Sequence, residues 1–79
     1  MGVDVESKLR TIIVNLLIVE DEEVTANASL LGDLGADSLD LVELTVDVEE
    51  AFDIEIADDD AEKWITFGDV LEYVTERVK

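Results

Sequence analysis

Apolar residues near the start of the chain recur with the spacing of one face of an α-helix. They return every three or four positions, and polar residues such as Lys8 and Thr11 fill the gaps. This period predicts an amphipathic helix over residues 3–17 that buries one face. The apolar positions are Val5, Leu9, Ile12, Ile13, Leu16 and Leu17.

Residues 18–37 form a long connection before the next helical pattern. A link of this length is unusual between two helices. It contains apolar residues that can pack, so we expect an ordered loop. Asn27 is a candidate cap for a short turn that ends at Leu31, and Gly32 and Gly35 permit tight backbone turns. The apolar residues of the connection are Val19, Val24, Leu30, Leu31 and Leu34.

A second helix is predicted over residues 38–52, and it has two apolar stripes on different faces. A helix in a small bundle needs only one buried stripe. The second stripe is therefore either part of a wide core face or a docking face surrounded by acids. The first stripe is Leu41, Leu44, Val48, Ala51 and Phe52, and the second is Leu39, Val42 and Val46.

The last third of the chain predicts a short helix and a longer one. Three aspartates at 58–60 favour a helix start, because acids are stabilised at the positive end of the helix dipole. Thr66 and Asp69 have the spacing of a capping box. The apolar face that follows is Phe67, Val70, Leu71, Val74 and Val78.

Together these patterns predict an all-α fold, a small four-helix bundle with a short third helix and a long ordered loop between helices 1 and 2. The chain has 79 residues, which suits a single domain over residues 1–79 with one small core.

The charge of the chain is strongly acidic. It has 22 acids against 5 bases, a net charge of −17, and residues 11–62 contain no base. Such a surface repels nucleic acid and anionic lipid, so neither is an expected partner. It attracts basic protein patches, although an acidic coat can also serve solubility alone.

Residue types exclude most catalytic chemistry. The chain has no histidine and no cysteine, so Ser-His-Asp triads, Cys-His pairs and His/Cys metal sites are impossible. A serine–lysine pair would need Lys8, Lys63 or Lys79, and no pattern places one near a serine. The run of acids at 58–62 lacks the spacing of a calcium-binding loop. We therefore expect no enzyme and no metal. No apolar run is long enough to span a bilayer, and no signal-peptide pattern is visible at the start of the sequence. The absence of cysteine is compatible with the cytoplasm, and a cytoplasmic location is our expectation.

Ser38 stands between two aspartates at the predicted start of the second helix. Asp37 and Ser38 are both good N-cap residues. If Asp37 is the cap, Ser38 keeps a free hydroxyl at the positive helix end, where a phosphate linked to it would meet unpaired backbone N–H groups. If Ser38 is the cap, its hydroxyl is committed to the backbone. The sequence leaves both options open.

The segment DLGADSLDLVEL closely resembles the phosphopantetheine-attachment motif of acyl carrier proteins of the dissociated fatty-acid-synthase type. EEVTANASL before it, VEEAFDIEIADDDAEK after it and the opening helix also resemble this family. The resemblance implies that Ser38, flanked by Asp37 and Leu39, carries 4′-phosphopantetheine, which a phosphopantetheinyl transferase takes from coenzyme A. The thiol of this group would hold acyl intermediates as thioesters, which would account for the missing cysteine.

The resemblance also implies a docking face on the second helix for acyl-handling enzymes with basic patches, and a monomeric carrier. The apolar contacts would be Leu39, Val42 and Val46, and the acids would be Asp40, Glu43, Asp47, Glu49, Glu50 and Asp53.

By position in the family, an acyl chain would lie among Leu30, Leu31, Leu41, Val48 and Trp64. Here the chain departs from the family, which usually has a medium aliphatic residue where Trp64 stands. Trp64 either fills or reshapes this space, or it turns outward while Ile65 takes the core position. Further departures are Ile18 for a frequent glycine, Ala57 for a frequent proline, Leu41 for a small polar residue and Thr45 for an aliphatic one.

We therefore consider a specialised carrier, and the pathway is open between fatty acids, polyketides and other lipids. An acidic helical adapter without a prosthetic group is the alternative.

Overall fold

The computed structural model describes residues 4–78, and within them it is helical. The elements are α1 (Val5–Leu17), the short 3₁₀ helix η1 (Asp21–Glu23), α2 (Ser38–Phe52), α3 (Asp58–Ala61) and α4 (Phe67–Arg77). No strand occurs between residues 4 and 78 apart from an isolated bridge between Ser29 and Thr66. The predicted all-α fold with a short third helix is confirmed.

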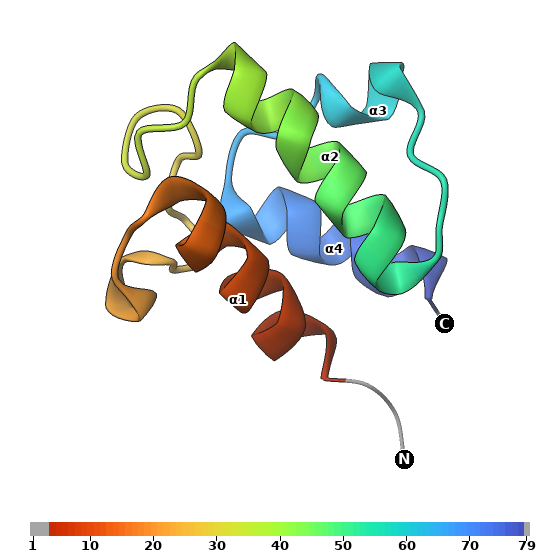
Figure 1. Ribbon diagram of the computed structural model, residues 1–79, viewed down its shortest axis with the longest axis horizontal. Coiled ribbons are helices and arrows are strands. Elements are labelled where there is room, and N and C mark those ends of the chain that lie inside the picture. The colour runs from red at the N-terminus through yellow and green to blue at the C-terminus, as the bar shows by residue number, and fades with distance from the viewer. Residues whose placement is uncertain (1–3, 79) are drawn as a thin grey trace.

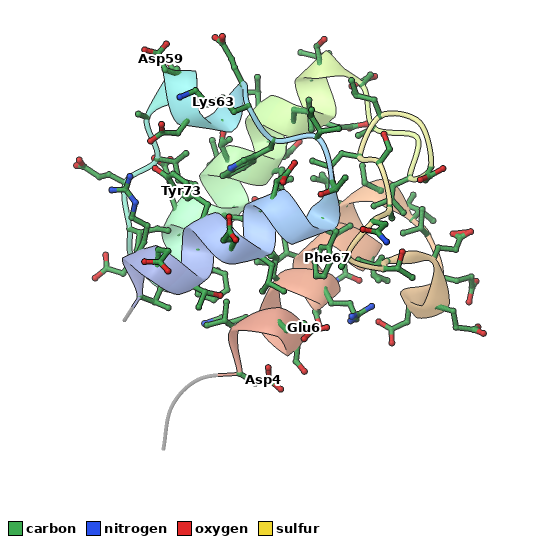
Figure 2. The ribbon with its side chains drawn as sticks, turned by 180° about the vertical axis from the view of Figure 1, so that it is seen from behind. Asp4, Glu6, Asp59, Lys63, Phe67 and Tyr73 are labelled. Atoms are coloured by element: carbon green, nitrogen blue, oxygen red, sulfur yellow. The ribbon has the colours of Figure 1, made fainter. Side chains whose placement is uncertain are left out.

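The three long helices pack together, and the remaining chain covers their ends. In Figure 1 the connection between α1 and α2, coloured orange to yellow, folds over one end of the helices, and α3 lies beside α2. Helix α4 is at the back of this view and at the front when the molecule is turned, as in Figure 2. The core is formed by side chains from every long helix and from both connections, including Leu9, Ile13, Val24, Leu30, Leu44, Val48, Phe67, Val70 and Val74.

Helix α1 has Asp4 as its N-cap and Ile18 as its C-cap, and Ile18 has a strained backbone conformation. The Asp4 carboxylate accepts a hydrogen bond from the Ser7 backbone N–H at 3.2 Å. The prediction began two residues earlier than the helix, and Val3 lies outside the described residues. At the other end, Ile18 adopts the left-handed conformation with φ of 55°, in which a helix end favours glycine because a side chain is strained there.

The connection from residue 18 to residue 37 is ordered, as predicted. Val24, Leu30 and Leu34 are buried, and the Leu30 N–H donates to the Ile65 carbonyl at 2.9 Å. The expected cap at Asn27 is wrong, because Ser29 closes the turn instead. Its Oγ accepts from the Gly32 N–H at 3.0 Å. Gly35 adopts a positive φ of 74° that a side chain would strain.

Arg10 fastens this connection to the helices. Its guanidinium donates to the backbone carbonyls of Asp21 and Val24, pairs with Glu6 at 2.7 Å and lies 5.3 Å from the centre of the Phe67 ring. One side chain of α1 therefore holds the loop after η1 and the start of α4, and this loop leads to Ser38.

Candidate functional site

Ser38 is the first residue of α2, and Asp37 is its N-cap. The Asp37 carboxylate accepts from the Asp40 N–H at 2.9 Å, and the Asp40 carboxylate accepts from the Asp37 N–H at 3.1 Å. Ser38 is exposed, and its hydroxyl makes no hydrogen bond within residues 4–78. Of the two options left open by the sequence, the structure selects the one in which this hydroxyl is free.

The backbone around Ser38 suits a phosphate. The N–H groups of Ser38 and Leu39 have no acceptor in the described part of the chain, because the first bond of the helix ladder is from Leu41 to Asp37. They lie at the positive end of a helix of 15 residues, and this end favours anions. A phosphodiester on the Ser38 oxygen would therefore fit the groups present.

A hollow of about 350 Å³ opens beside Ser38 between two walls. Helix α2 supplies one wall, and α3 with the residue after it supplies the other. The Thr45 hydroxyl is already satisfied, because it donates to the Val42 carbonyl at 2.6 Å. The lining residues are Ser38, Leu41, Val42, Thr45, Asp58, Ala61 and Glu62.

Of the five residues expected around an acyl chain, only Leu41 lines this hollow. Leu30 and Val48 are fully buried in the core, whereas Leu31 is exposed. Sequence reasoning did not select Asp58, Ala61 and Glu62. Their spacing of three and four residues on a helix was the available signal, since it places them on one face.

Trp64 lies inward, and Ile65 lies outward. Trp64 is 8% exposed and belongs to the core, whereas Ile65 is 66% exposed. The indole packs edge-on against Tyr73, with ring centres 5.5 Å apart, and its buried Nε1 finds no acceptor among the residues that the structure describes. Trp64 does not line the hollow beside Ser38 but a second hollow on the other side of α3.

The second apolar stripe of α2 is exposed and does not belong to the core. Leu39 is 80% exposed, Val42 62% and Val46 44%. Acids on and directly after the same helix surround the stripe, and two of them are engaged in hydrogen bonds within the chain. Asp40 belongs to the capping box, and Glu49 accepts from the Ile56 N–H at 2.9 Å. Exposed acids are Glu43, Glu50 and Asp53, and half-buried acids are Asp40, Asp47 and Glu49.

Neither of the lysines that the structure describes lines the hollow beside Ser38. Lys8 donates to the Ala51 carbonyl at the far end of α2, Lys63 lines the second hollow, and Lys79 lies outside the described residues. Among residues 4–78 no group of three or more acidic side chains is arranged to hold a metal ion. None of the described helices has the length and apolarity needed to cross a membrane.

Comparison with known proteins identifies the family. Residues 7–74 match the family model described as a phosphopantetheine attachment site. The chain is 55% identical over 74 residues to an acyl carrier protein of Desulforapulum autotrophicum, which covers 92% of this chain and 96% of that protein. A solved structure assigned as an acyl carrier protein of Mycobacterium tuberculosis superposes with a TM-score of 0.86 at 39% identity, over 91% of this chain and 96% of that one. The chain therefore belongs to the acyl carrier proteins, which are carriers with covalently attached 4′-phosphopantetheine and not enzymes.

Proposed function

We propose that Ser38 is the attachment residue and that this chain carries acyl intermediates of fatty acid or related lipid or polyketide biosynthesis. The observation that supports the assignment most directly is the free Ser38 hydroxyl beside two unpaired backbone N–H groups at the start of α2. Asp37 contributes by taking the cap position, because this leaves the serine oxygen available to a transferase.

The prosthetic group supplies a terminal thiol, and this thiol holds the acyl group as a thioester. The residues of this chain have a different task, which is to orient and shelter. Leu41, Val42 and Ala61 give the hollow beside Ser38 an apolar lining into which an acyl chain can fold. The proposal therefore places the acyl chain between α2 and α3. A role of Leu30, Val48 and Trp64 as a deeper border, and of Leu31, stays a prediction.

We further propose that the exposed face of α2 is the docking surface for partner enzymes with basic patches. Leu39, Val42 and Val46 form an exposed apolar strip, and acids surround it. Attraction between unlike charges speeds the encounter, and a small apolar contact holds it briefly. A carrier that visits several enzymes needs such short-lived complexes. We also propose that the protein is a monomer and that it is located in the cytoplasm.

The decisive experiment is the intact mass of the protein after incubation with coenzyme A, magnesium and a broad-specificity phosphopantetheinyl transferase. We expect a gain of one phosphopantetheine that Ser38→Ala abolishes and that Ser29→Ala, a serine in the preceding turn, leaves unchanged. A folded protein without this gain, tested beside an active control carrier, would favour the acidic adapter without a prosthetic group.

A further inference from the structure

Helix α3 is a single turn whose two sides face different parts of the molecule. Asp58, Ala61 and the following Glu62 line the hollow beside Ser38. Asp60 lies on the other side, toward α4, and lines the second hollow together with Tyr73 and Arg77. Helix α3 is therefore the wall of the Ser38 hollow opposite α2, and its other side faces α4.

The attachment at the back of α3 is a cluster of three side chains, which we call the latch. The Tyr73 hydroxyl donates to the Asp60 carboxylate at 2.9 Å, and Arg77 approaches the same oxygen at 3.4 Å. The Arg77 guanidinium also lies 4.6 Å from the centre of the Tyr73 ring. Asp60 and Tyr73 are half-buried, so competition from water is reduced at this contact.

Other contacts fix the two ends of the α3 segment, and between them Ala61 packs half-buried against the core. The Ile56 N–H is bound by Glu49 before the helix, and Trp64 is buried after it. No side chain in the described part of the chain caps the start of α3, and a helix of four residues has little stability of its own. Between these two ends, the latch is the side-chain contact that joins α3 to α4, on the side of α3 that faces away from the hollow.

We propose that Asp60, Tyr73 and Arg77 are positioning residues that set the width of the hollow beside Ser38, and thereby the length of acyl chain that it shelters. The proposal rests on the proposed function, because it assigns the cargo to this hollow. Opening the latch releases α3 from its fixed position on α4, so a long acyl chain can push α3 away from α2 and gain shelter in the widened hollow.

The first test measures the latch itself in the protein without a prosthetic group. Asp60→Asn weakens the pairing with Arg77, and Tyr73→Phe removes the hydroxyl but keeps the ring against Trp64. Asp59→Asn is the matched control. It removes the same charge one residue away, and Asp59 is exposed, makes no hydrogen bond or ion pair among residues 4–78 and projects away from α4 (Figure 2).

The readout is hydrogen exchange of the Ala61 and Glu62 amides, which donate to the Ala57 and Asp58 carbonyls at 3.1 Å. We expect exchange about two to five times faster in Asp60→Asn and Tyr73→Phe than in Asp59→Asn, the factor that corresponds to one lost hydrogen bond or partly exposed ion pair. Equal exchange in all three variants, or faster exchange throughout the protein, would overturn the latch.

The second test uses butanoyl, octanoyl and dodecanoyl thioesters of each variant and measures their cleavage by hydroxylamine. We expect the latch variants to protect the dodecanoyl thioester relative to the butanoyl one by about two- to fivefold more than Asp59→Asn does. A change by the same factor at all three lengths would indicate a general loss of stability and overturn the role in cargo length. Absence of the mass gain at Ser38 would instead overturn the proposed function, and the exchange experiment would still decide on the latch.

Discussion

Gly68, at the start of α4, touches the backbone of Ala26 in the connection between α1 and α2. Its N–H donates to the Ala26 carbonyl at 2.9 Å, and a Cβ on Gly68 would also lie 2.9 Å from that oxygen. The contact joins two segments that are more than 40 residues apart in the chain, and it helps to hold the loop that leads to Ser38.

We expect Gly68→Ala to destabilise the protein by about 1–2 kcal/mol, because the clash with backbone exceeds the gain in helix propensity. Urea unfolding would measure the difference. Gly32→Ala is the matched control, since its new Cβ would meet the Ser29 side chain at 3.2 Å and not a backbone atom. A Gly68→Ala protein as stable as the parent would show that the two segments can separate without cost.

Ile18 should be a site at which a substitution stabilises the protein. It has φ of 55° and is 89% exposed, so a β-branched residue is held in a strained conformation without burial in return. We expect Ile18→Gly to raise the free energy of unfolding by about 1 kcal/mol.

Thermal unfolding of Ile18→Gly and Ile18→Ala separates strain from exposure. Alanine removes the exposed apolar surface but keeps a Cβ at a positive φ, so it should recover little of the gain. If both variants gain equally, backbone strain is not the cause.

Substitutions at Asp37 and Ser38 should show that the stability of the fold and the modification of Ser38 depend on different residues. We expect Asp37→Ala to lose about 1 kcal/mol of stability, because the Asp40 N–H loses its acceptor. Ser38→Ala should stay within about 0.5 kcal/mol of the parent, since the exposed hydroxyl makes no hydrogen bond to any described residue. Chemical unfolding together with the mass assay checks both statements, and a large stability loss in Ser38→Ala would contradict a free hydroxyl.

Asp69 should contribute to stability in a manner that depends on pH. Hydrogen bonds from the backbone N–H groups of Ile65 and Thr66 hold the pKa of Asp69 below its ordinary value. The contribution is therefore fully present above the pKa of the unfolded chain, and it is lost as the pH falls through the lower pKa of the folded state. Asp69→Asn should be less stable than the parent at neutral pH, and this difference should shrink in acid.

The measurement is the melting temperature of Asp69→Asn and the parent between neutral and strongly acidic pH. Asp59→Asn, which removes the same charge from an exposed position, corrects for the change in overall repulsion. A difference between parent and Asp69→Asn that is independent of pH would show that the carboxylate is not held by these bonds in its charged form.

The net charge of −17 should make stability sensitive to ions. Sodium chloride and magnesium both reduce repulsion among the acids, so we expect each to raise the melting temperature. Calorimetry across a salt series measures the effect. A melting temperature that responds to neither ion would contradict a folded state strained by self-repulsion.

Features that depend on neighbours in the chain were readable from the sequence. The helices over residues 38–52 and after Thr66 begin where the capping residues indicate, because a cap is satisfied within three residues. The exposed stripe of Leu39, Val42 and Val46 was visible as a second periodicity, although its exposure was not. The motif around Ser38 predicts the attachment site by resemblance, and the free hydroxyl was one of two options that the sequence left open.

Tertiary structure alone decided what depends on distant pairs. Trp64 and not Ile65 is in the core, where it packs against Tyr73. The local sequence pattern does not show which of the two residues is buried. The hollow beside Ser38 lies between α2 and α3, and Asp60 of α3 contacts Tyr73 and Arg77 of α4. Local backbone preferences set where a helix starts and which side is apolar, whereas the space between two helices is set by contacts that only the folded chain brings together.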